Sequence, residues 1–381
     1  MHTRVIEPRQ LTVLVTSKCT AACAHCCMNS SPERDDTLTW EQLERILTQA
    51  LTELDLRVII FAGGEPMLLG ETLYRAIRLC KQHGRMTRIV TNAYWAGNRD
   101  HALLKLKELR AAGLDELNIS TDDYHDPYIS FDHVRNAYEV ALTLDFSAVV
   151  LANCYGPNST LTPDRLTTAL ATPDMQLRFD DDGQGKSLVK KKGKTLVVLS
   201  NSPVQRLGRG IDQLPEEDFP STPIGQSLDE LADAIGGCPH AIRSAAISAK
   251  GHLLACCGFE LEGNPILDFG DLAEHSMAEL LDRADDDLCA NLIAILGPVK
   301  VMRLLQKICP DEVSFPRNYR SYCEACADVV DVEQNRRALY RHMDDLAPLM
   351  LQARDILRSY RDKGIDGPVA LKVTLSVVEP P

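Results

Sequence analysis

Apolar and polar residues along the first 200 positions follow two alternating periods. Short runs rich in β-branched residues, such as 11–15 and 116–120, have the composition of buried strands. Between these runs, apolar residues recur at every third or fourth position, which is typical of one face of a helix. Predicted strands lie at 11–15, 57–61, 88–91, 116–120, 146–152 and 195–199. Predicted helices lie at 39–54, 72–82, 100–112 and 133–144.

Residues at the ends of these segments support the pattern. Thr39 and Gln42 form a capping-box sequence at the start of the first helix. Gly84 and Gly113 follow two other helices, where glycine is the usual C-terminal cap. Strands that alternate with helices form parallel sheets through right-handed crossovers, and ligands bind at the carboxyl ends of such strands. The pattern therefore predicts an α/β fold with its functional residues at one edge of a parallel sheet.

Composition limits the class of protein. The chain has 381 residues, 13 cysteines and a formal net charge of −13. This charge disfavours extended nucleic acid as a partner, because affinity there comes largely from neutralised phosphates. No run of about 18 apolar residues is present to span a membrane, and the N-terminus has no signal- or transit-peptide pattern. We therefore expect a cytoplasmic chain whose cysteines bind metal instead of forming disulfides.

Three cysteines follow the first predicted strand at the spacing C-x3-C-x2-C: Cys19, Cys23 and Cys26. A structural zinc site takes four protein ligands. A 4Fe–4S cluster held by three thiolates instead leaves one iron open for an exogenous ligand. A zinc knuckle, an electron-transfer iron–sulfur site and simple burial are alternatives for these cysteines.

A glycine-rich loop, Ala62-Gly63-Gly64-Glu65-Pro66, follows the second predicted strand. None of those alternatives accounts for it. The cysteine triplet and this loop, in this order at two strand ends, resemble the radical S-adenosylmethionine (SAM) superfamily. The resemblance implies a partial (β/α)6 barrel and a 4Fe–4S cluster whose open iron binds SAM. It also implies reductive cleavage of SAM to a 5′-deoxyadenosyl radical, with Gly63, Gly64 and Glu65 engaging the amino group of SAM.

Further candidates lie at the ends of the third and fourth strands. Thr91 and Asn92 resemble the family's T-N-G segment against SAM, although Ala93 replaces the glycine. Ser120 and Asp122 stand where related enzymes place polar groups on the ribose or carboxylate of SAM.

The residues that follow have two interpretations. Asp123, Tyr124 and His125 either face the substrate as proton donors or acceptors or belong to a polar loop in which Asp122 caps a turn. Cys154, after the fifth strand, is either buried or quenches a radical.

A second set of cysteines lies in the C-terminal half. Cys238, Gly251 and Cys256 resemble the opening C-x9–15-G-x4-C signature of SPASM and twitch domains, and Cys323 and Cys326 form a C-x2-C pair. The resemblance implies one auxiliary 4Fe–4S cluster held by the four cysteines. Four thiolates also suit a structural zinc ion, which stays an alternative.

Other features of this half leave the ligand set partly open. A full SPASM domain has two more cysteines, where this chain has Val332 and Arg336. Cys257 is an alternative to Cys256, and Cys289 and Cys309 are reserve ligands in a predicted helical insertion. We predict a barrel at 8–210, an auxiliary-cluster domain at 211–330 and a mostly helical extension at 331–381, with a last strand at 369–378. The lysine-rich segment 186–194 is predicted to be irregular, and either solvated or in contact with an acidic substrate.

The resemblance fixes the reaction type better than the substrate. The radical is expected to abstract hydrogen from a ribosomally made peptide, with a crosslink, epimerisation or oxidation as the outcome. A small molecule, such as a sugar or nucleotide, is the alternative substrate. A flavodoxin or ferredoxin is the expected electron donor. A non-catalytic iron–sulfur protein is the alternative from another class.

Overall fold

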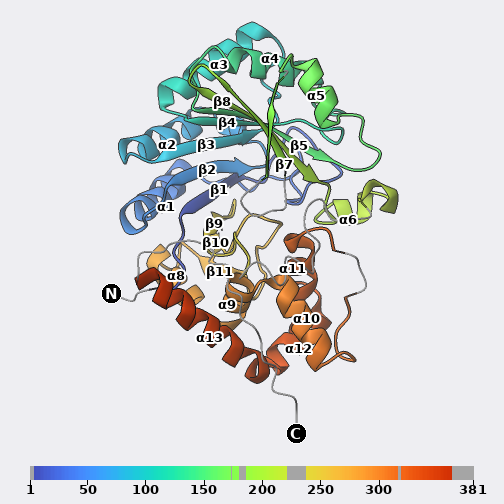
Figure 1. Cartoon of the computed structure of the whole chain (residues 1–381). Coiled ribbons are helices and arrows are strands. Elements are labelled where there is room, and N and C mark those ends of the chain that lie inside the picture. The colour runs from blue at the N-terminus through green and yellow to red at the C-terminus, as the bar shows by residue number, and fades with distance from the viewer. Residues whose placement is uncertain (1–3, 173, 180–185, 221–236, 316–318, 363–381) are drawn as a thin grey trace.

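The computed structural model describes residues 4–172, 174–179, 186–220, 237–315 and 319–362. One mixed sheet runs through the molecule, in the strand order β11-β10-β9-β1-β2-β3-β4-β5-β8-β7-β6. Its central six strands are parallel to one another and form the barrel half, drawn in the upper part of Figure 1. These strands are β1 (Gln10–Thr16), β2 (Val58–Gly63), β3 (Met86–Thr91), β4 (Glu116–Ser120), β5 (Ala148–Tyr155) and β8 (Thr195–Pro203). The predicted α/β class and partial barrel are confirmed.

Helices cover the outer face of this sheet (Figure 1). They are α1 (Trp40–Glu53), α2 (Glu71–Gln82), α3 (Arg99–Ala112), α4 (Phe131–Ala141) and α5 (Pro163–Ala169), and the turn η1 (Pro66–Leu69) precedes α2. The capping box at Thr39 and Gln42 forms in both directions. Gly113 ends α3 in the left-handed region at φ 105°. Each strand alternates between side chains packed under these helices and side chains that face the inside of the barrel, as in β3 and β4.

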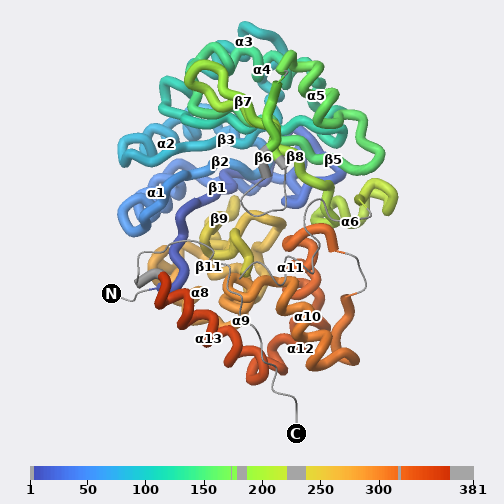
Figure 2. The backbone as a smooth tube through the Cα atoms, viewed as in Figure 1, coloured from blue at the N-terminus to red at the C-terminus, as the bar shows by residue number. Residues whose placement is uncertain are grey.

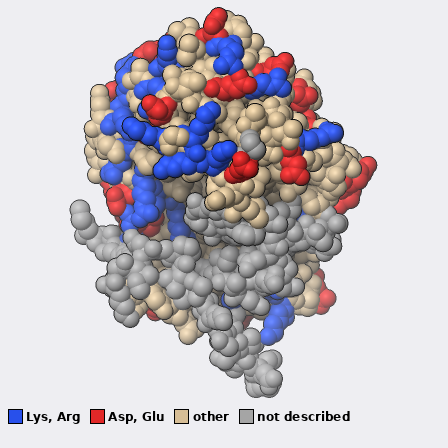
Figure 3. Space-filling model, turned by 45° about the horizontal axis from the view of Figure 1, so that its top comes forward, with Lys and Arg blue, Asp and Glu red and all other residues tan. Residues whose placement is uncertain are grey.

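The region between β5 and β8 differs from the predicted pattern. Residues of β6 (Gln176–Phe179) and β7 (Lys186–Lys192) form antiparallel strands, and β7 and β8 are joined by a tight turn at Gly193, φ 60°. The prediction of an irregular lysine-rich segment was wrong, because the lysines occupy an outer antiparallel strand that needs no buried face. Lys191 and Lys192 are exposed there. Figure 3 shows Lys and Arg side chains gathered on one side of this half, although the net charge is −13.

The C-terminal half is joined to the barrel through the sheet. Strand β9 (Ser244–Ile247) pairs in parallel with β1, and β10 (His252–Leu254) and β11 (Asp268–Asp271) continue antiparallel from it. Short turns α6 (Gly210–Gln213) and η2 (Glu216–Asp218) follow the barrel. The remaining helical segments are α8 (Met277–Asp286), α9 (Leu288–Asn291), the π-helix η3 (Leu292–Leu296), α10 (Pro298–Ile308), α11 (Tyr322–Val330), α12 (Glu333–Arg341) and α13 (Met343–Asp362).

Two hydrophobic cores correspond to the two halves. The barrel core includes the fully buried Cys80, for which burial was the preferred interpretation. The second core holds the cysteines at 238, 256 and 326 together with side chains of α12 and α13. The N-terminal residues Val5 and Ile6 belong to it as well, and Figure 2 shows that segment passing along the lower half before it enters β1. The predicted strand at 369–378 lies outside the described residues.

No single helix within the described ranges is long and apolar enough to cross a membrane. One bent pair, Leu288–Leu296 with Pro298–Ile308, meets the requirement by length and composition at an angle of 111°.

Candidate functional site

The cysteine triplet lies on the loop that leaves the carboxyl end of β1. The backbone N–H of Cys19 donates to the carbonyl of Ser31 at 3.0 Å, and that of Cys26 donates to the carbonyl of Cys23 at 3.1 Å. Burial raises the pKa of the Cys19 thiol to about 12, and the nearby charges of Glu65, Cys23 and Cys26 add to the effect. The three thiols are therefore close together, and they must lose protons when they bind a metal.

The two glycines of the 62–66 loop bring β2 against the start of the cysteine loop. A Cβ atom on Gly64 would lie 2.0 Å from the carbonyl oxygen of Lys18, and one on Gly63 would lie 2.4 Å from that of Thr16. The N–H groups of Gly64 and Glu65 donate to these two carbonyls at 2.6 and 2.8 Å. No larger residue fits so close an approach of two backbones. The glycines thus position the strand that carries the cysteines.

Glu65 is completely buried and holds the end of β3. Its carboxylate accepts hydrogen bonds from the Thr91 hydroxyl at 2.9 Å, the Asn92 N–H at 2.9 Å and the Met67 N–H at 3.0 Å. Burial raises the pKa of Glu65 to about 7, against the lowering effect of these donors. A carboxylate has about four lone-pair positions. Three are used, so one remains for a further donor.

Asn92 connects the third strand to the cysteine loop. Its side-chain N–H group donates to the Thr20 hydroxyl at 3.0 Å and faces the Cys19 sulfur at 3.7 Å. The next residue, Ala93, has φ 63°. That left-handed backbone explains why glycine is usual at this position in the family.

At the end of β4, Asp122 is 3 % exposed and organises two histidines. Its Oδ1 accepts from the N–H groups of Tyr124 and His125 and lies 2.8 Å from Nδ1 of His125. Its Oδ2 lies 3.5 Å from Nε2 of His25. Burial favours the neutral carboxyl, but the two histidines outweigh it and lower the pKa of Asp122 well below its usual range. The turn-capping interpretation of Asp122 is thus met in the structure, together with a histidine pair.

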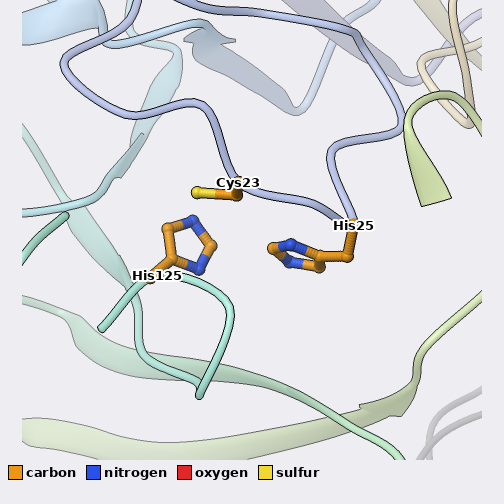
Figure 4. Close-up of side chains that lie close together, drawn as sticks. All are labelled: Cys23, His25 and His125. Carbon is orange, nitrogen blue, oxygen red and sulfur yellow. The ribbon is translucent and has the colours of Figure 1, made fainter. Parts of the chain in front are cut away.

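His25 lies in the cysteine loop and completes this cluster. Its ring stacks on Tyr124 with centroids 4.8 Å apart and meets the His125 ring edge-on at 5.0 Å. Ligand atoms of Cys23, His25 and His125 all lie within 4.8 Å of one another, and Figure 4 shows the three side chains converging. Sequence reasoning did not select His25, and its place inside the cysteine motif was the signal.

The other predicted residues of this strand end point elsewhere. The Asp123 carboxylate accepts from the Thr160 hydroxyl at 2.6 Å and from the Leu161 N–H at 3.2 Å, so it fixes the loop after β5. Burial, with the charges of Cys154 and Asp218, raises the pKa of Tyr124. Ser120 is half-buried on the inner face of β4.

The four auxiliary cysteines come together in the second core. Cys238, Cys256 and Cys326 are buried and Cys323 is half-buried, and burial and mutual charge raise the pKa of Cys256, Cys323 and Cys326. A Cβ on Gly258 would lie 3.0 Å from the Cys323 sulfur and 3.7 Å from that of Cys256. The glycine therefore leaves the space around these sulfurs open. This donor set suits one fully ligated cluster or one zinc ion.

Two more thiols lie between the sets. The charge of Cys27 acts on Cys256 and Cys323, and Cys27 and Cys257 interact with each other. The Cys27 carbonyl accepts from the N–H of Glu260 at 3.2 Å, and the Cys257 thiol faces the Thr12 hydroxyl at 3.6 Å. The Cys-Cys doublets in the sequence were the signal for this proximity. Cys289 and Cys309 instead lie among the core helices, where the Cys309 thiol donates to the Leu305 carbonyl at 3.3 Å.

Arg209 holds the cysteine loop from the end of β8, and sequence reasoning missed its role. Its guanidinium donates to the carbonyls of Cys23 at 3.0 Å and Ser30 at 2.6 Å, and its N–H donates to that of Cys26 at 3.2 Å. A Cβ on the preceding Gly208 would lie 2.4 Å from the Cys26 carbonyl oxygen. The Gly-Arg pair was visible in the sequence, but its partner, some 180 positions earlier, was not.

Residues 13–158 match the Radical SAM superfamily. This match and the cysteine loop in a partial barrel show that the chain contains a radical SAM domain, the class that uses a 4Fe–4S cluster and SAM. The fold also resembles the solved structure of native anSMEcpe with bound AdoMet, at a TM-score of 0.53 and 13% identity, over 91% of this chain and 100% of that one.

Curated relatives match over shorter stretches. YydG of Bacillus subtilis (strain 168), which carries the name of a peptide biosynthesis protein, is 24% identical over 131 residues, 34% of this chain and 41% of that protein. GTP 3′,8-cyclase of Corynebacterium glutamicum (strain R) is 32% identical over 120 residues, 30% of this chain and 31% of that protein. The chain thus spans about two fifths or less of the length of these relatives.

Proposed function

We propose that this protein cleaves SAM reductively and uses the resulting radical to modify a ribosomally made peptide by crosslinking, epimerisation or oxidation. The observation that carries the proposal is the convergence of Cys19, Cys23 and Cys26 at one strand end, beside Glu65 and Asn92. Three thiols and no fourth in the motif suit a cluster with one open iron. When bound, the cluster supplies the electron that generates the 5′-deoxyadenosyl radical from SAM.

The chain's own residues bind and orient the cofactor. The remaining acceptor position of Glu65 suits the ammonium group of SAM, and a group with a pKa of about 7 ionises readily beside a positive charge. Gly63, Gly64 and Thr91 support this carboxylate, and Ser120 and Asp122 are the candidates for the other polar groups of SAM. Tyr124 and His125 are the candidates for proton transfer, whereas Asp123 is engaged with the loop after β5.

The auxiliary cysteines are proposed to hold one 4Fe–4S cluster that relays electrons or supports the fold. They are Cys238, Cys256, Cys323 and Cys326. We divide the chain into a barrel (8–210), an auxiliary-cluster domain (211–330) and a helical extension (331–381), and place the protein in the cytoplasm with a flavodoxin or ferredoxin as its electron donor.

A peptide substrate is favoured by two likenesses. One is the name of YydG, and the other is the fold shared with a structure of anSMEcpe solved with AdoMet and the Cp18Cys peptide, at a TM-score of 0.50 and 11% identity. The likeness to GTP 3′,8-cyclase keeps a small molecule, such as a nucleotide, as the second candidate.

The test is 5′-deoxyadenosine formation by anaerobically reconstituted protein given SAM and dithionite, measured by liquid chromatography and mass spectrometry. Wild type and Cys80→Ala, which removes a core cysteine far from the loop motif, are expected to form the product. Cys26→Ala is expected to form none. An iron-loaded wild type that forms no product with SAM, alone or with peptides encoded beside its gene, would contradict the proposal and favour a non-catalytic iron–sulfur protein.

A further inference from the structure

A line of polar contacts runs from the end of β4 to the cysteine loop. Oδ1 of Asp122 lies 2.8 Å from Nδ1 of His125, and the His125 ring is in hydrogen-bonding contact with the Cys23 thiol. Figure 4 shows Cys23 and His125 facing each other across the gap between their two segments. Since Nδ1 is turned to the carboxylate, the contact with the sulfur is made through Nε2.

The line is shielded from water. Asp122 is 3 % exposed and Cys23 is 5 % exposed. The Asp122 side chain also caps its own turn, because Oδ1 accepts from the N–H groups of Tyr124 and His125. His125 is thus fixed both by its backbone and by its ring, and hydrogen bonds in such surroundings are stronger than in water.

Both ring nitrogens of His125 have an acceptor when Cys23 is a thiolate. A ring that donates through both nitrogens is the imidazolium form. The other groups that face it are the Oδ2 side of Asp122 and the ring of His25, whose own Nδ1 is buried without a hydrogen-bond partner. Asp122 supplies the negative charge that balances an imidazolium at this position.

Hydrogen bonds to the sulfur ligands of an iron–sulfur cluster are among the factors that set its reduction potential. A carboxylate that orients a histidine toward a metal centre is a recurrent arrangement, in which the histidine position depends on the carboxylate. A donor at a cysteine sulfur stabilises the added negative charge of the reduced cluster. It therefore makes reduction easier.

We propose that His125, held by Asp122, is a positioning residue that donates a hydrogen bond to the Cys23 sulfur and raises the reduction potential of the cluster. This inference rests on the proposed function, because it requires Cys23 to be a cluster ligand. It gives Asp122 and His125 a role in electron entry, separate from contact with SAM or substrate.

The test compares two amides that each replace one ring nitrogen. Asn in His125→Asn reaches only the position of Nδ1, so it keeps the Asp122 contact and loses the one to Cys23. Gln in His125→Gln reaches the position of Nε2 and keeps a donor at the sulfur. The measurement is a redox titration of the reconstituted protein followed by electron paramagnetic resonance, on the signal that Cys26→Ala removes.

We expect His125→Asn to lower the equilibrium constant for one-electron reduction about tenfold, which is a fall of about 59 mV in midpoint potential. His125→Gln is expected to stay within about twofold of wild type. His133→Asn is the matched control, because His133 is also half-buried and bonds the Tyr94 carbonyl through Nδ1, which Asn imitates. It is expected to leave the potential unchanged.

Asp122→Asn separates the relay from a direct charge effect. The amide oxygen still caps the turn, so the fold is kept. In the relay the variant loses the imidazolium and lowers the potential, whereas removal of a negative charge that acted directly would raise it. Combined with His125→Asn, it is expected to add little, since coupled residues are not additive.

The outcomes are distinguishable. A wild-type potential in iron-loaded His125→Asn, an equal fall in both His125 variants, or a rise in Asp122→Asn would overturn the relay and leave the proposed function standing. A wild type without any signal that Cys26→Ala removes would overturn the proposed function itself. If His125→Asn fails to bind iron, the His125→Gln and Asp122→Asn results decide.

Discussion

The two cysteine sets of this chain are built in opposite ways. The first lies on one continuous loop, from Cys19 to Cys26, and polar contacts from several strand ends hold it in place. The second collects four cysteines from segments as distant as Cys238 and Cys326 and places them in a hydrophobic core. Three thiols on a loop leave a cluster open to an exogenous ligand, whereas four thiols in a core close it. The difference suits one set to chemistry and the other to electron relay or support.

The strongest test of this contrast exchanges the damage between the two sets. We expect Cys23→Ala to reduce 5′-deoxyadenosine formation by about three orders of magnitude or more, because the catalytic cluster loses a ligand. We expect Cys326→Ala to retain it within about tenfold while the iron content falls by about half. Iron analysis and the rate of 5′-deoxyadenosine formation measure the two effects.

Equal losses of 5′-deoxyadenosine in the two variants would contradict the division of roles. An iron content in Cys326→Ala equal to that of wild type, with bound zinc, would show that the second set is a zinc site.

The loop set depends on backbone contacts that a single methyl group can break. We expect Gly64→Ala to destabilise the fold by about 3 kcal/mol, because its Cβ would lie 2.0 Å from the Lys18 carbonyl oxygen. Gly84→Ala is the matched control, since Gly84 has φ 71° with no atom within 4 Å of the added Cβ. Left-handed backbone alone costs about 1–2 kcal/mol. Urea unfolding of both variants gives the difference, and equal losses would show that the close approach is not rigid.

The smallest expected effect concerns the contact of β8 with the loop. We expect Arg209→Gln to cost about 1–3 kcal/mol, because the buried carbonyls of Cys23 and Ser30 lose charged donors. Iron incorporation should fall with it, while Arg337→Gln, at an exposed ion pair on α12, should change neither. Unfolding curves and iron analysis check both; unchanged iron in a destabilised Arg209→Gln would limit Arg209 to the fold.

What the sequence predicted well is local in the chain. The strand Glu116–Ser120, the capping box at Thr39 and the cysteine triplet all depend on neighbouring residues, so spacing and periodicity were sufficient. The strands β6 and β7 were missed because lysines conceal the alternation of an outer strand. The contacts of Arg209 with the loop and of Asp123 with Thr160 join distant segments through side-chain geometry, which no local pattern encodes.

The parallel pairing of β9 with β1 has a consequence for how the protein is made. Until Ser244–Ile247 leave the ribosome, β1 has an unpaired edge, and the cysteine loop lacks the contacts that Glu260 makes with Cys27 and Asn29. An open strand edge is a site for association with other chains. The N-terminal barrel therefore waits for the second half during synthesis. Cluster assembly on its loop is accordingly a late event, and a chain cut after the barrel would tend to aggregate.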